Sequence, residues 1–561
     1  MSETQPTALE DLCDSALSLM FDASPFAATS LGIPGWDDKV PEVDREASRR
    51  HADSARAIAA KAEAIDVATL SDADRVTRAI LIHEASVSAD ATELRMIEFT
   101  TAPMFVAPHA PVLQTMPKTV LADAARADAY LERLSGLASY LDSAGQQLLA
   151  GTAEGRTAAA RSLAGSIGAV DAYLASDLES DLLHVPAAPE WDGKAAFEER
   201  RTALVRDHVR PALARLRDTY KQLLGSARPD DKVGVGWLPD GEHVYEVCAR
   251  EHTSTDLKPQ ELHQLGLDVL EQLKAEYAEI GARVFGTSDP AEVLDRMRND
   301  PGVRLGSVDE LLTISQAALD RCQAALPDWF GLLPASDCVM QQIPDEEAKT
   351  SAPAYYTPPD ASTGRRGTYW VNGHEITKRA KLDVETIAFH EAIPGHHLQL
   401  AIAQQMTELP LFRRVNISTA YAEGWGLYSE RLADEMGLYS SDLQRLGMLQ
   451  CDSWRACRLV VDSGLHAMGW SFERAVQFMT ENSAVPLSVV TPEVDRYVGM
   501  PGQALGYMVG RKEIERMRRE ATVALGPAFD IKGFHDAVLG AGSLPLAVLD
   551  GEVKRWVAAQ R

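Results

Sequence analysis

Four residues in the second half of the chain have the types and spacing needed for metal chemistry. His390 and Glu391 are adjacent, His396 follows six positions after the first histidine, and Glu423 follows 27 residues later. Two imidazoles and one carboxylate suit a zinc ion. A further carboxylate beside the ion can accept a proton from the water that attacks a carbonyl. These residues predict metal-assisted hydrolysis of an amide bond, with Glu391 as the general base.

The spacing of the two histidines departs from the H-E-x-x-H pattern, in which they lie one helical turn apart and share one zinc ion. Here the corresponding position is Pro394, and on an ideal helix His396 would lie about 9 Å along the axis and about 120° around from His390. Both reach one ion only if the helix is distorted. Pro394 and Gly395 predict that distortion, because proline removes a helical hydrogen bond and glycine tolerates unusual dihedral angles. His396 is preferred as the second ligand, and His397 remains the alternative.

A second predicted helix carries the third ligand. The first helix is expected to end near residues 408–410, and the next to return antiparallel and bring Glu423 to the histidines. Glu430 is seven residues further on, so it shares the helical face of Glu423 two turns away. It can accept a hydrogen bond from a ligand histidine and orient the ring. The predicted metal ligands are therefore His390, His396 and Glu423, with Glu430 and His397 around them.

Three phrases resemble those of a bacterial domain-of-unknown-function family, number 885, over about residues 354–511. They are His-Glu-x-x-Pro-Gly-His-His-x-Gln, Glu-Gly-Trp-x-Leu-Tyr-x-Glu and Pro-Gly-Gln-Ala-x-x-Tyr. More distantly, the histidine–glutamate pair before Gly395-His396 is similar to the metal helix of neurolysin, thimet oligopeptidase and angiotensin-converting enzyme, where a downstream glutamate completes the site. The resemblance implies a gluzincin with a deep active-site cleft between two helical lobes. By analogy with that cleft, the substrate is a short peptide or peptide-like molecule.

Further candidates follow from this resemblance and from side-chain chemistry. Tyr507 corresponds to a residue that donates to the oxyanion, with a buried packing tyrosine as the alternative. His466 is a second catalytic candidate, with a satisfied core histidine as the alternative. Arg511, one turn after Tyr507, is expected to bind a substrate carboxylate. Arg458 and Arg496 are interpreted as helix-surface residues that could bind a C-terminal carboxylate.

Three short segments between the helical parts predict a small antiparallel sheet. They are residues 339–343, 354–357 and 367–372, and the last two are rich in tyrosine, threonine and tryptophan. The third segment directly precedes the metal helix. As an edge strand it would bind the substrate backbone through Tyr369 and its neighbours. An ordinary buried strand is the alternative.

The rest of the chain has the apolar periodicity of amphipathic helices, which predicts a mostly α fold. We expect residues 1–337 to form a helical region that is one wall of the cleft, and residues 338–561 to form the catalytic region. Among 561 residues, 45% are apolar, so a large core is available. The alternatives to a peptidase are a zinc hydrolase of a non-peptide amide or modified amino acid, and a non-catalytic helical binding protein.

Composition excludes several classes of protein. The formal net charge of −27 disfavours nucleic acid and anionic lipid as partners. Six cysteines without a C-x-x-C pair disfavour a disulfide scaffold. The sequence contains no stretch of about 18 uncharged apolar residues, so no membrane span is expected. Met1–Glu10 lacks the pattern of a signal peptide. These features predict a cytoplasmic protein, and the oligomeric state is open.

Overall fold

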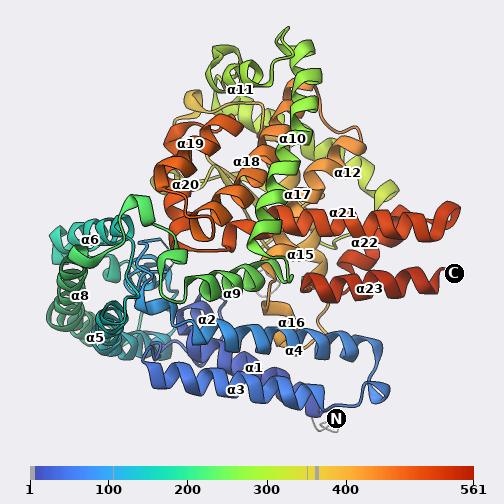
Figure 1. The fold of residues 1–561 in the computed structure, drawn as a ribbon. Coiled ribbons are helices and arrows are strands. Elements are labelled where there is room, and N and C mark those ends of the chain that lie inside the picture. Colours follow the sequence, from blue (N-terminus) through green and yellow to red (C-terminus); the bar gives the residue numbers. More distant parts are fainter. Residues whose placement is uncertain (1–6, 105, 350, 360–364) are drawn as a thin grey trace.

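The computed structural model describes residues 7–104, 106–349, 351–359 and 365–561, and it consists mostly of α-helices, as predicted (Figure 1). Part of the segment used for the signal-peptide prediction, residues 1–6, lies outside the described residues. Within the described residues, no helix combines the length and apolar character needed to cross a membrane. The cytoplasmic location stays a prediction.

Helix starts are marked by residues whose side chains accept a backbone N–H that has no partner within the helix. The side chain of Thr7 caps the first helix, and Asp44, Ser307 and Ser441 cap three later ones. In the first half the helices are α1 (Ala8–Ala23), α2 (Pro25–Ser30), α3 (Arg45–Glu63), α4 (Asp72–Glu93), α5 (Ala124–Ala153), α6 (Ala160–Ala175), α7 (Lys194–Leu204), α8 (Arg210–Leu223), α9 (Gly241–Thr253), α10 (Pro259–Val284), α11 (Pro290–Asn299) and α12 (Val308–Trp329).

The second half contains one short helix within the sheet region, α13, and further helices that follow the sheet and continue nearly to the C-terminus. They are α13 (Asp345–Ala348), α14 (Val384–Glu391), α15 (His396–Gln404), α16 (Leu411–Val415), α17 (Thr419–Glu435), α18 (Asp442–His466), α19 (Phe472–Asn482), α20 (Leu487–Gly499), α21 (Gly506–Leu525), α22 (Ile531–Leu539) and α23 (Leu546–Ala559). α17 packs against α14 and α21, and α18 packs against α10. α18 also contacts α14, α17 and α21, so these four helices pack together.

The small sheet is present, but it is mixed rather than antiparallel. β1 (Cys338–Gln342) pairs parallel with β3 (Gly367–Val371), and β2 (Ala354–Thr357) pairs antiparallel with β3 on its other side. The parallel pair is possible because the chain crosses over through α13 before it returns. The prediction that the third strand is an edge strand is wrong, since β3 is central and its backbone is paired on both sides. Tyr369 on this strand is buried.

Two large hydrophobic cores and two small clusters lie within the described residues. The larger core draws buried side chains from both predicted regions, from Leu9 to Val553. The smaller core lies between Phe26 and Leu223 and fills the lobe made of α5 to α8, at the left of Figure 1. The predicted division at 337/338 and the deep cleft stay predictions.

Candidate metal centre

The helix that carries the histidines stops and starts again between them. α14 ends at Glu391, and α15 begins at His396. Between them Ala392 has φ −102° and ψ −108°, and the Ile393–Pro394 peptide bond is cis. The predicted distortion is therefore confirmed, and it is a complete break rather than a bend.

The break is held by close packing of backbone on backbone and by α17. A Cβ atom on Gly395 would lie 1.9 Å from the carbonyl oxygen of His390, so only glycine fits there. From α17, the indole of Trp425 donates to the Pro394 carbonyl at 2.9 Å, and the hydroxyl of Ser429 donates to the same oxygen at 3.2 Å. The two ends of the broken helix are thus fixed relative to the helix that carries the predicted third ligand.

The three predicted ligands converge. Nε2 of His390 lies 3.4 Å from Oε2 of Glu423, and Nε2 of His396 lies 3.7 Å from the same oxygen. The donor atoms of all three residues lie within 4.8 Å of one another. Ligands about 2 Å from a tetrahedral ion stand roughly 3.3 Å apart, so this spacing fits a single ion such as zinc.

Glycines on α17 make the convergence possible. A Cβ atom on Gly426 would lie 2.6 Å from the ring of His390, so the missing side chain provides the space for the imidazole. A Cβ atom on Gly424 would lie 2.5 Å from the backbone of Gly510 on α21. α17 therefore touches α21 backbone to backbone, beside Glu423.

The hydrogen bonds of the histidines show which of His396 and His397 is free to face Glu423. Nδ1 of His390 donates to Glu430 at 2.8 Å, which leaves Nε2 for a metal and confirms the expected position of Glu430. His397 uses both nitrogens elsewhere: Nδ1 accepts from the Tyr356 hydroxyl at 2.8 Å, and Nε2 donates to the Ser336 carbonyl at 3.0 Å. His396, rather than His397, therefore faces Glu423.

The electrostatics of the cluster favour an added positive charge. Burial acts to lower the pKa of His390, but its hydrogen bonds to Glu423 and Glu430 outweigh burial and raise the pKa to about 10. Burial opposes ionisation of Glu423 too, yet the two histidines hold its pKa well below the usual range. Burial raises the pKa of Glu391, the proposed base. Nδ1 of His396 is buried without a hydrogen-bond partner among the described residues. The donor set and its charge fit a divalent cation.

Tyr507 and His466, the two further catalytic candidates, have different surroundings. Tyr507 on α21 is half-buried and within electrostatic reach of Glu423; burial, and then the Glu423 charge, raise its pKa to about 12. His466 is buried, Nδ1 accepts from the backbone N–H of Val235 at 3.0 Å, and Nε2 donates to the Tyr497 carbonyl at 3.0 Å. His466 thus matches the satisfied core histidine that the sequence left as its alternative.

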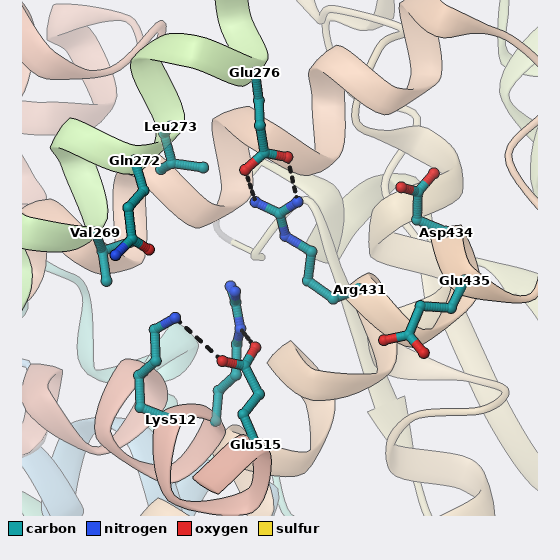
Figure 2. A pocket seen from close by; sticks show the side chains of 10 residues that line it. Val269, Gln272, Leu273, Glu276, Arg431, Asp434, Glu435, Lys512 and Glu515 are labelled. Carbon is teal, nitrogen blue, oxygen red and sulfur yellow. Dashed lines mark hydrogen bonds and ion pairs between the residues drawn. The ribbon is translucent and has the colours of Figure 1, made fainter. Parts of the chain in front are cut away.

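Arg511 was predicted to bind a substrate carboxylate, but in the structure it forms ion pairs with carboxylates of the chain itself. It is buried, it pairs with Asp452, and its Nε donates to Glu515 at 2.6 Å. It lines a pocket of about 290 Å³, on whose walls Glu276 meets Arg431 and Lys512 meets Glu515 (Figure 2). No histidine lines this pocket. The reason lies in the contact of α21 with α17 at Gly510, which turns the next residue toward α18.

Three arginines near the centre were missed or misplaced by the sequence analysis. Arg458 and Arg496 were interpreted as surface residues, which is wrong, because 6% and 14% of their side chains are exposed. Arg455 was not singled out, yet its Nη2 lies 3.7 Å from Glu430, and its charge acts on Glu391. The available signal was two arginines three positions apart within an otherwise apolar helical run.

Comparison with known proteins places the chain in a family. The model of the family described as "Bacterial protein of unknown function (DUF885)" matches residues 25–553, so this chain belongs to that family. A proposed lipoprotein from Colwellia psychrerythraea has a similar structure, with a TM-score of 0.88 and 25% identity over 98% of this chain and 99% of that one. A proposed lipoprotein of unknown function from Shewanella oneidensis shares the fold, with a TM-score of 0.79 and 17% identity over 97% and 99% of the two chains. Comparison with curated protein sequences gives no match.

Proposed function

We propose that this protein is a zinc-dependent hydrolase that cleaves amide bonds of short peptides or peptide-like molecules, with a gluzincin type of site. The observation that carries the proposal is the convergence of His390, His396 and Glu423, whose donor atoms lie within 4.8 Å of one another. Glu391 directly follows the first of these ligands. A site that only stabilised the fold would have no need of this additional carboxylate.

Residues of the chain would hold the metal ion, transfer the proton and stabilise the oxyanion. When bound by His390, His396 and Glu423, a zinc ion would polarise the substrate carbonyl and make water more acidic. Glu391 takes the proton of the attacking water and passes it to the leaving amine. The Tyr507 hydroxyl stays protonated at neutral pH, because its pKa is about 12, and can donate to the oxyanion.

Glu391→Gln together with metal analysis tests this proposal. We expect about one zinc per chain in both proteins, with activity on short peptides reduced by roughly 10²–10⁴-fold in the variant, because a general base is lost while the ligands remain. Glu375→Gln is the matched control: it alters a second histidine–glutamate pair, His374-Glu375, whose glutamate is exposed and pairs with Lys378. Full activity of metal-free protein, or of Glu391→Gln, would refute the proposal.

Two alternative functions are a hydrolase with another substrate class and a binding protein without catalytic activity. A hydrolase of non-peptide amides or modified amino acids would use the same residues, so a panel of dipeptides, oligopeptides and small amides separates it. A non-catalytic binding protein would be favoured by a closed site with His397 as a fourth ligand. Both nitrogens of His397 are already engaged by Tyr356 and Ser336, which speaks against that arrangement.

A further inference from the structure

A cluster of buried cationic side chains lies beside Tyr507. We call it the arginine cluster, and it consists of Arg455 and Arg458 on α18 and Arg496 on α20. The guanidinium carbon of Arg458 lies 4.5 Å from the centre of the Tyr507 ring and 4.8 Å from that of Trp454. Between 6% and 14% of each arginine side chain is exposed. In a chain with a net charge of −27, three recessed arginines at one place require an explanation.

Several N–H donors in the cluster have no partner among the described residues. Arg458 donates from Nη2 to Glu493 at 2.9 Å and from Nε to the Tyr497 hydroxyl at 3.0 Å, but its Nη1 is buried and unpartnered. Nε of Arg455 and Nε1 of Trp454 are also buried and unpartnered. A buried donor without an acceptor costs roughly 1–3 kcal/mol, and more when it is charged. The cluster therefore lacks an acceptor.

The charge of the cluster is also incompletely balanced. Arg458 and Arg496 share one carboxylate, Glu493, which also accepts from the Tyr497 hydroxyl at 2.8 Å. Burial opposes ionisation of Glu493, but the two arginines outweigh it and lower its pKa to about 2. The closest carboxylate oxygen to Arg455 is that of Glu430 at 3.7 Å, beyond hydrogen-bond distance. One further carboxylate would satisfy both the charge and the free donors.

Tyr507 connects the arginine cluster with the candidate metal centre. The charges of Glu423 and of all three arginines act on its hydroxyl, and the guanidinium of Arg458 lies over its ring. The positive charge of Arg455 also acts on Glu391, where it lowers the carboxyl pKa against the effect of burial. The guanidinium of Arg458 lies against the rings of Tyr507 and Trp454, both of which are half-buried. A shift of one of these rings would let an acceptor reach it.

We propose that Arg455 and Arg458 bind a carboxylate of the substrate, so that the preferred substrate is a short peptide-like amide with a free carboxylate close to the cleaved bond. This inference rests on the proposed hydrolase function and names its substrate class. Nη1 of Arg458 and Nε of Arg455 are free to donate to a carboxylate, while Nη2 and Nε of Arg458 keep Glu493 and the Tyr497 hydroxyl. Lysine, with a single ammonium, cannot serve all of these acceptors from the same position. The carboxylate can come from a C-terminus or from an acidic side chain, because the recognition chemistry is the same.

Binding to protein that does not turn over provides the direct test. N-acetyl-alanine, N-acetyl-alaninamide and the α-amide of N-acetyl-aspartate are titrated calorimetrically into zinc-loaded Glu391→Gln protein. We expect the first compound to bind at least about tenfold more tightly than the neutral amide, and Arg458→Lys in the same background to remove that preference. Tight binding of the third compound would assign the site to acidic side chains, and weak binding would assign it to the C-terminus. Equal binding of acid and neutral amide would overturn the proposal.

Controls separate this proposal from the hydrolase proposal. Arg455→Lys is the second variant if Arg458→Lys does not fold, and Arg474→Gln changes an exposed arginine on α19 that lies outside the cluster. We expect Arg474→Gln to keep the preference for the acid. Acid-selective binding without turnover by the wild-type protein would refute the hydrolase and retain the carboxylate site. Turnover by the wild-type protein, with equal binding of the acid and the neutral amide, would support the hydrolase and refute the carboxylate site.

Discussion

Two charged regions of the molecule share α17 and differ in how their groups are paired. The first is the candidate metal centre, and the second is an ion-pair network made of Glu276, Arg431, Asp452, Arg511 and Glu515. In the network, Nη1 of Arg431 lies 2.6 Å from Glu276, and Nε of Arg511 lies 2.6 Å from Glu515. In the centre, the closest approaches of the imidazoles to Glu423 are 3.4 and 3.7 Å.

The difference separates a region that holds helices together from one that is suited to bind a ligand. Every carboxylate of the network has a guanidinium partner, and Lys512 beside Glu515 supplies the third positive charge for three carboxylates. Glu430 and Arg431 are consecutive on α17, and they point to the centre and to the network respectively. One helix thus anchors itself with one residue and orients a histidine with the next.

The largest expected effect is the loss of zinc on changing a ligand. His396→Ala should weaken zinc binding by more than the roughly 10–100-fold typical of an outer-shell residue, with little effect on folding, because Nδ1 of His396 makes no hydrogen bond among the described residues. Competition with a chelator measures the affinity. His397→Ala is the control and should keep zinc while it loses the hydrogen bonds to Tyr356 and Ser336. Zinc loss in the control alone would reverse the assignment.

The next effect concerns the network. Asp452→Ala should lower the free energy of unfolding by about 3–5 kcal/mol, because Arg431 and Arg511 would be left without their shared carboxylate. Urea denaturation measures the change. Asp434→Ala removes a partner of Arg445 that is more exposed than Asp452, and it should lower the free energy of unfolding by about 0–1 kcal/mol. Equal costs for the two variants would show that the network does not anchor the helices.

The network should also make the protein sensitive to acid. Burial opposes ionisation of Glu515, but Arg511 and Lys512 outweigh it and lower its pKa from 4.5 to about 2. Since the folded-state pKa is the lower one, the contribution to stability is present above about pH 4.5 and is lost as the pH falls toward 2. A pKa shift of this size contributes about 3 kcal/mol to the free energy of unfolding. Unfolding between pH 2 and 7 should therefore depend less on pH in Glu515→Gln than in the wild-type protein.

The smallest effect is expected for the residue that orients a ligand. Glu430→Gln should weaken zinc binding by about 10–100-fold, or roughly 1.4–2.7 kcal/mol, because the bond to Nδ1 of His390 loses its charge. The same chelator competition measures it. An unchanged affinity would mean that the ring of His390 is held by packing against Gly426 alone.

Part of the candidate site could be predicted because its causes are local. Pro394 and Gly395 cannot continue a regular helix whatever surrounds them, and a periodicity of seven puts Glu430 on the face of Glu423. The arginines could not be placed in this way. A helical pattern identifies an apolar face, but it does not reveal whether a charged residue within that face meets solvent, as Arg458 was expected to, or a buried carboxylate, as it does.

The sequence alone determined the mostly helical fold, the helix break between His390 and His396, and the position of Glu430 on the face of Glu423, since these follow from propensities and from spacing within about ten residues. Only the tertiary structure decided that His396 rather than His397 faces Glu423, that β3 is central, and that Arg511 belongs to the network. Each of these outcomes depends on a partner far away in the chain. Which of two adjacent side chains meets such a partner is fixed by the packing of whole helices, which short-range patterns do not encode.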